Sequence, residues 1–147
     1  MNIEQLRKEL ERDEGVKYEV YLDHLGYPTF GIGHLITDND PEYGASLGTK
    51  IYNDRVQEAF ETDIETVLSD CERLYVQFEH LPEEVQLIIA NMMFNMGRPR
   101  LSQFRNFRIA LERSNWKEAA AEGRNSRWYK QVTNRAERLM TRMENVS

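Results

Sequence analysis

The stretch from Val85 to Met96 constrains the fold most, because its side chains are apolar on almost every face of a helix. A helix of this kind has to be buried on most sides. Pro82 followed by two glutamates is typical of a helix start, and Gly97 is typical of a helix end. Polar residues interrupt the stretch, and it is too short to span a bilayer. The sequence therefore predicts a helix at the centre of a helical part of the protein.

Several other segments repeat apolar residues with the spacing of a helix. The longest is expected to be capped by Asn53 and to keep one apolar face as far as Tyr75. A helix of this length could join two lobes. Asn115 and Thr133 precede the last two helices. The predicted helices cover about residues 3–13, 54–79, 103–111, 116–122 and 135–143.

A different pattern appears between Tyr18 and Leu35, where short alternating runs of aromatic and β-branched residues are broken by glycines and a proline. This pattern predicts a small antiparallel sheet with tight turns. The segment from Thr37 to Gly48 is rich in Asp, Asn, Pro and Gly and is expected to be an exposed loop.

These elements predict an α+β fold in one domain, residues 1–147. A small antiparallel sheet lobe is expected over about residues 15–53. A larger helical lobe is expected over about residues 1–14 and 75–147, and the helix over about 54–79 would link the two. A cleft between two lobes is a natural place for an extended substrate.

Cys71 is the only cysteine, so an intramolecular disulfide is impossible and folding in a reducing cytoplasm fits best. The first residues are charged and lack the apolar core of a secretory signal. We therefore expect no export of this chain by the usual secretory route.

The net charge of −6 hides a division along the chain. Residues 1–97 carry 7 Lys/Arg against 20 Asp/Glu, whereas residues 98–147 carry 12 against 5. A basic surface could attract an anionic polymer such as nucleic acid or the bacterial wall. The alternative is that the arginines form solvated helix faces paired with nearby glutamates, and charge alone does not choose between these interpretations.

Glu14 and Asp23 are acidic residues that suit glycoside hydrolysis. That reaction needs one protonated carboxyl to donate to the leaving oxygen and an ionised one to assist water or act as a nucleophile. Glu14 is expected at the end of the first helix, where unpaired carbonyls disfavour a carboxylate. Asp23 is expected at a strand end, from which it can face the helix end. Spacing alone leaves two ordinary alternatives open, a solvated charge at position 14 and a turn residue bonded to its own backbone at position 23.

Three separated motifs narrow these alternatives. The active-site segment of the T-even bacteriophage lysozymes closely resembles DEGVKYEVYLDHLGYPTFGIGHL at residues 13–35. Two later segments of that family resemble NMMFNMG at residues 91–97 and SRWYKQVTNRAERL at residues 126–139, in the same order. The similarity covers about residues 3–142. Three motifs in order are far more specific than a pair of carboxylates.

The resemblance implies roles for three residues in the first motif. Glu14 stands where the family has its general acid. Asp23 stands where the family has the carboxylate that orients or activates water, and Thr29 where a hydroxyl helps to position that water. The implied reaction is hydrolysis of the β-1,4 bond between N-acetylmuramic acid and N-acetylglucosamine, with inversion at the anomeric carbon and no cofactor.

Further positions match residues that support this chemistry. Arg135 matches a position close to the acid, although an ordinary surface arginine is the alternative. His34 matches a histidine that pairs with a carboxylate on the long helix, here Asp63, which favours a structural pair over a third catalytic group. The histidines and the cysteine show no metal-ligand spacing.

Leu35 and Phe94 match positions that line the substrate cleft of the family, although either could be plain core. Asn95 replaces a longer amide, so a substrate contact there is either lost or mediated by water. Trp128 and Tyr129 are expected to anchor the packing of the C-terminal region. The segment after Thr37 is shorter than usual for the family.

The implied partner is bacterial peptidoglycan, which would be met by a monomer with no nucleic acid and no stable membrane insertion. The implied location is the cytoplasm of a bacterial host after synthesis. The wall would then be attacked from the periplasm, after holin-dependent release or cell breakage.

Two alternatives stay open. A lytic transglycosylase would also need an acid but would form an anhydro sugar without water, and the presence of Asp23 and Thr29 argues against it. The basic C-terminal region could instead act as a non-catalytic module that binds the wall or a membrane. The residues that would give such a module its charge are Arg124, Arg127, Lys130, Arg135, Arg138 and Arg142.

Overall fold

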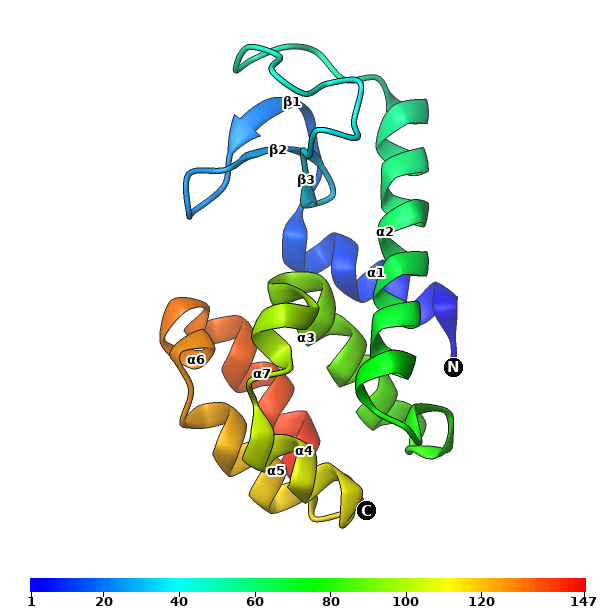
Figure 1. Cartoon of the computed structure of the whole chain (residues 1–147), viewed down its shortest axis with the longest axis vertical. Helices are drawn as coiled ribbons and strands as arrows, with labels where there is room; N and C mark the ends of the chain where they lie inside the picture. Colours follow the sequence, from blue (N-terminus) through cyan, green and yellow to red (C-terminus); the bar gives the residue numbers. More distant parts are fainter. The chain divides into compact units, whose positions relative to one another are not determined.

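The computed structural model describes all residues from 1 to 147 and has an α+β fold, as the sequence predicts. A three-stranded antiparallel sheet occurs with a larger number of helices (Figure 1). The elements in chain order are α1 (Ile3–Glu14), β1 (Lys17–Leu22), β2 (Pro28–Gly31), β3 (His34–Leu35), α2 (Asn53–Leu74), the 3-10 helix η1 (Phe78–His80), α3 (Glu83–Leu101), α4 (Arg105–Glu112), α5 (Trp116–Arg124), α6 (Arg127–Gln131) and α7 (Thr133–Glu144).

The chain divides into two compact units. The sheet unit comprises residues 7–66, and the helical unit comprises residues 1–6 together with 67–147. The boundary between the two units falls inside α1 and inside α2. Within the sheet unit, Arg7 on α1 donates hydrogen bonds of 2.6 and 2.8 Å to Glu61 on α2, which ties these helical segments to each other.

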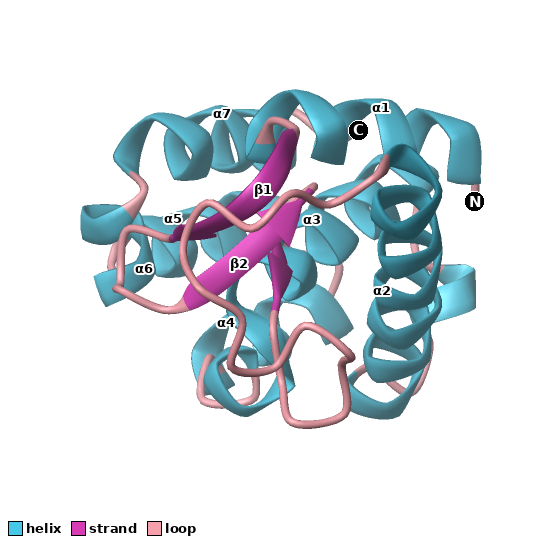
Figure 2. Cartoon of the chain, turned by 90° about the horizontal axis from the view of Figure 1, so that it is seen from above, coloured by secondary structure: helices cyan, strands magenta, loops and turns pink.

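In the sheet unit the strands follow one another in the order β1-β2-β3, each antiparallel to the next. Figure 2 shows β1 and β2 side by side, with the loop after β3 returning along them. The return is fixed by backbone bonds from Val20 to Thr49 and from Ile51 to Tyr18, each 2.9 Å long. The predicted loop over residues 37–48 therefore has no regular element but is bonded to the edge of the sheet.

The core of the sheet unit is built from residues of β1 and β2, from the turn after β2 and from one face of α2. Val20, Phe30 and Ile32 are buried, as are Val56 and Phe60 on α2. Val56 and Phe60 are about one helical turn apart, so they lie on the same face of α2.

In the helical unit, α3 is buried along most of its length, with Val85, Ile88 and Ile89 fully inside. This confirms the central helix that the apolar stretch predicts. Gly97 has φ 80°, so the regular helix ends there as predicted, although a further short turn reaches Leu101. The α5 helix packs against α4 and α7. None of the helices combines the length and the apolar character that crossing a bilayer requires.

Two details of the helical unit differ from the predicted elements. The long helix ends at Leu74 and not near residue 79, and the chain then turns so that Phe78 becomes buried while Val76 is exposed. The short helix α6 is absent from the prediction. The Ser126 hydroxyl caps it by accepting a hydrogen bond of 3.2 Å from the Tyr129 amide. Asn115 caps α5, as predicted, with a bond of 3.1 Å to the Glu118 amide.

Candidate active site

Glu14 is the last residue of α1, as the sequence predicts. The next residue, Gly15, has φ 73° and donates its amide to the Glu11 carbonyl, which ends the helix. Only glycine adopts this left-handed conformation readily. The helix end therefore fixes where the Glu14 side chain leaves the backbone.

The turn between β2 and β3 lies directly against the Glu14 carboxyl group. A Cβ atom at Gly33 would be 2.6 Å from Glu14 Oε1 and 2.9 Å from its Cδ. Gly33 also has φ 63°. The backbone conformation therefore favours glycine at this position, and a Cβ atom there would displace the Glu14 carboxyl group. Gly33 lies in the motif at residues 13–35, but the sequence did not reveal that this glycine lies against Glu14.

Asp23 directly follows β1 and holds the turn into β2. Its Oδ1 atom accepts hydrogen bonds of 2.9 Å from the amides of both Leu25 and Tyr27, and its own amide donates to the Tyr27 carbonyl. Oδ2 takes part in none of these bonds. The turn-forming role therefore leaves one carboxylate oxygen for a catalytic role.

Thr29 is buried in β2 and lies opposite Tyr21 of β1. Its hydroxyl donates a hydrogen bond of 2.9 Å to the Tyr27 carbonyl. The donor proton is thus committed to the backbone, while the hydroxyl oxygen can still accept a bond, for instance from a water molecule. Tyr27 therefore orients both Asp23 and Thr29.

Tyr21 connects the two carboxylates electrostatically. Burial raises the pKa of the Tyr21 hydroxyl, and the negative charges of Glu14 and Asp23 raise it further. The Lys17 ammonium lies 4.2 Å from the centre of the Tyr21 ring. A protonated phenol can donate a hydrogen bond to either carboxylate or to a sugar. Tyr21 was missed at the level of the sequence, and its only signal is its place two residues before Asp23.

His34 lies between two carboxylates of the sheet unit. Its Nδ1 is 2.7 Å from Asp63 Oδ2 on α2, and its Nε2 is 3.0 Å from Asp40 Oδ2. Both ring nitrogens donate only when the imidazole is protonated. The sequence named Asp63 as the partner, whereas Asp40 has no counterpart in that prediction. This double contact suits a structural role for His34.

We expect the stability that His34 contributes to depend on pH. Burial is the largest single influence on its pKa and lowers it, but hydrogen bonds to Asp63 and Asp40 and their charges together raise the pKa above 6.5. A raised pKa means that the stabilisation is complete below pH 6.5 and is lost as the pH rises through the folded-state value. Replacing His34 by Asn should cost about 1.5–3 kcal/mol at pH 6.

Urea unfolding of the wild type and of His34→Asn between pH 5 and pH 9 measures this effect. The difference in the free energy of unfolding should shrink towards pH 9. A difference that stays constant over the whole range would show that the imidazolium does not stabilise the fold.

The other site residues that the sequence suggests are divided between the two units. Leu35 in the sheet unit is 48% exposed, so it can contact a ligand. Phe94, Asn95 and Arg135 belong to the helical unit. Asn95 Oδ1 accepts a hydrogen bond of 2.7 Å from the indole of Trp128, so this amide oxygen already has a packing partner.

Arg135 is bonded within the helical unit. Its Nε donates a hydrogen bond of 2.9 Å to Asn91 Oδ1, and the Asn91 side chain is fully buried. The Trp128 ring is 2% exposed, which places it in the core as a packing residue. No group of three or more His, Cys, Asp or Glu side chains in residues 1–147 is arranged to hold a metal ion.

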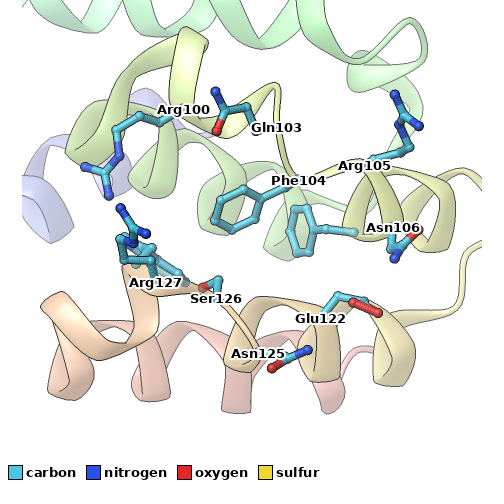
Figure 3. Close-up of a pocket in the computed structure, with 11 residues that line it drawn as sticks. Arg100, Gln103, Phe104, Arg105, Asn106, Glu122, Asn125, Ser126 and Arg127 are labelled. Atoms are coloured by element: carbon cyan, nitrogen blue, oxygen red, sulfur yellow. The ribbon is translucent and has the colours of Figure 1, made fainter.

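The helical unit also contains a pocket of about 590 Å³ (Figure 3). Aromatic rings line it together with the arginines Arg100, Arg105 and Arg127. In Figure 3, Arg100 and Arg127 extend towards the same side of the pocket. Arg100 Nη2 is bonded to Gln131 at 2.6 Å.

Comparisons with known proteins show which family the chain is similar to. The phage lysozyme family model matches residues 11–145. The probable T4-type lysozyme 2 of Dictyostelium discoideum is 31% identical, over 97% of this chain and 95% of that protein.

Two proteins of bacteriophages match over a smaller share of their own length. The peptidoglycan hydrolase gp36 of Pseudomonas phage phiKMV is 34% identical, over 93% of this chain and 15% of that protein. The pre-baseplate central spike protein Gp5 of Enterobacteria phage T4 is 31% identical, over 88% of this chain and 26% of that protein. The extent of the family match, together with the relative that is similar over its whole length, shows that this chain belongs to the phage lysozyme family.

Proposed function

We propose that this chain is an inverting muramidase, which hydrolyses the β-1,4 bond between N-acetylmuramic acid and N-acetylglucosamine. Family membership supports the broader statement, that the chain is a lysozyme acting on peptidoglycan. The observation that carries the finer proposal is that Glu14 ends α1 against the turn at Gly33, while Asp23 is held through Oδ1 and keeps Oδ2 outside those bonds, both in the sheet unit. Inverting glycoside hydrolysis requires such a pair of carboxyl groups, one to donate a proton and one to activate water.

In the proposed reaction, Glu14 donates its proton to the glycosidic oxygen as the bond to the anomeric carbon breaks. A water molecule attacks that carbon from the opposite face, and Asp23 accepts the proton that the water loses. Thr29 orients the water through its free hydroxyl lone pair. The turn at Gly33 fixes the acid, and the amides of Leu25 and Tyr27 fix the base.

Analysis of freshly released products tests this mechanism. Inversion of a β bond should give an α-configured reducing end, which proton NMR detects before mutarotation equilibrates the anomers. A β-configured product would indicate a double displacement with Asp23 as nucleophile. An anhydro sugar in the mass spectrum would indicate a lytic transglycosylase and would rule out attack by water.

We also propose that residues of the helical unit contact the substrate. Phe94 and Asn95 are proposed to contact the glycan together with Leu35 of the sheet unit, and Arg135 is proposed to modulate the acid. We also propose that the protein acts as a monomer. Its access to the wall from the periplasm would depend on a holin or on cell breakage.

The alternative of a non-catalytic wall- or membrane-binding module finds little support in the C-terminal helices. Arg124 forms ion pairs with Glu137 and Glu144, and Arg142 pairs with Glu84. The apolar residues that would have to enter a bilayer are buried, namely Trp128, Leu139, Met140 and Met143. Two of the six basic residues are thus held in ion pairs and the apolar residues belong to the core, which favours the enzyme over a membrane-binding module.

A further inference from the structure

Asp40 lies in the loop after β3 and gathers donors from three parts of the sheet unit. Its Oδ2 is 3.0 Å from His34 Nε2 of β3 and 2.9 Å from the Thr37 amide. Its Oδ1 accepts a bond of 3.0 Å from Arg55 Nη2 of α2. The Asp40 side chain is 14% exposed. A carboxylate with this many donors is fixed in position.

Arg55 extends the same network. Its guanidinium donates two bonds, 2.8 and 3.0 Å long, to Glu42, and a third of 2.8 Å to Glu58. The guanidinium carbon also lies 5.3 Å from the centre of the Phe30 ring, in the range of a cation–π contact. Arg55 therefore connects α2, the loop and the sheet through one rigid planar group.

Phe30 and His34 receive these contacts at the two ends of the turn between β2 and β3. They are direct partners across the two strands, and their rings are 4.8 Å apart. The turn between them contains Gly33, which lies against the Glu14 carboxyl group. Phe30 also directly follows Thr29. An unbroken series of contacts thus leads from Arg55 and Asp40 to the proposed acid and to the residue proposed to hold the water.

The charge of this network argues against a purely stabilising purpose. Four carboxylates, those of Asp40, Glu42, Glu58 and Asp63, surround one arginine and one histidine. His34 is buried, Asp40, Glu42, Arg55 and Asp63 are partly exposed, and the desolvation of such groups offsets part of the attraction between them. What such a network supplies is a single defined geometry.

We propose that Asp40 and Arg55 are positioning residues for the reaction, which hold the turn at Gly33 against Glu14 by way of His34 and Phe30. This inference rests on the proposed function. The two residues touch no substrate. They reduce the freedom of the turn, so that Glu14 and Thr29 keep the geometry that the reaction needs.

The decisive comparison is between Asp40→Ala and Asp40→Asn. Asparagine keeps one oxygen that accepts from His34 and from the Thr37 amide, but it places an NH2 group where Oδ1 accepts from Arg55. Alanine removes both oxygens. We expect kcat on soluble glycan fragments to fall roughly ten-fold in Asp40→Ala, with KM within about two-fold of the wild type. The Asp40→Asn variant should recover part of this kcat, because the contacts with His34 and Thr37 persist while the bond to Arg55 is lost. Arg55→Lys should also fall between Asp40→Ala and the wild type, because an ammonium lacks the planar fork that bonds Asp40 and Glu42 together.

Two control variants separate positioning from stability. Glu61→Gln weakens the pair with Arg7 in the same unit without touching the turn, so it should lower the unfolding temperature but leave kcat unchanged. Glu58→Gln removes the most exposed partner of Arg55, which is 71% exposed, and should change neither quantity.

The outcomes are distinct from those that test the proposed function. A wild type that releases no reducing sugar would overturn the proposed function, whatever the variants do. With an active wild type, an unchanged kcat in Asp40→Ala would overturn the positioning role. A loss of kcat matched by Glu61→Gln, or one that Asp40→Asn fails to recover, would do the same. If Asp40→Ala does not fold, Arg55→Lys against the same controls gives the decision.

Discussion

Replacing Glu14 by Gln should reduce the release of reducing sugar from peptidoglycan roughly 100- to 10,000-fold, because the leaving oxygen loses its proton donor. Glutamine has nearly the same shape, so the contact with Gly33 should persist. The unfolding temperature should therefore change little. Reducing-sugar release and thermal unfolding, measured on the same samples, separate the loss of chemistry from a loss of structure.

A matched variant on the same helix makes this comparison specific. Glu11→Gln alters a carboxylate one turn earlier on α1, and full activity is expected. A Glu14→Gln protein that still cleared peptidoglycan at the wild-type rate would remove position 14 from the mechanism. Sedimentation of the inactive variant with cell walls would also measure binding without cleavage.

The second large effect is expected for Gly33→Ala. A methyl group would be placed 2.6 Å from Glu14 Oε1, so the carboxyl group would have to move. Displacing a catalytic group by about 1 Å can cost roughly 100-fold in rate. The positive φ of 63° adds backbone strain, about 1–3 kcal/mol for a residue held in a sparsely populated conformation.

Gly44→Ala is the control for this substitution. Gly44 lies in the same unit and also has a positive φ, 82°, but a Cβ atom there would meet nothing within 4 Å. It should show the backbone strain without the loss of rate. Equal losses of rate in both variants would mean that strain alone, and not the contact with Glu14, explains the effect of Gly33→Ala.

The features that the sequence predicts best are those that depend on neighbours in the chain. The apolar run from Val85, the end of the regular helix at Gly97 and the Asn115 cap all follow from local periodicity and backbone preferences. The same holds for the place of Glu14 at the end of α1. Each of these depends on residues within about one helical turn.

The features that the sequence did not reveal depend on contacts between distant residues. Asp40 and Arg55 are 15 positions apart, and nothing in their local pattern marks them as partners. The close approach of Gly33 to Glu14 likewise results from the packing of a turn on a helix end. The end of α2 at Leu74 was missed because the burial of Phe78 overrides a helical pattern that continues in the sequence.

At Asp23, Oδ1 holds the turn through two backbone amides while Oδ2 takes part in neither bond. An asparagine at this position would keep the amide-accepting oxygen and replace the other oxygen, with its negative charge, by an NH2 group. Under the proposed mechanism this one substitution removes the group that accepts the proton from water and leaves the turn intact, so the fold could serve a protein that binds glycan without cleaving it. A member of the family could thus keep its fold and lose hydrolysis through a change in this one side chain.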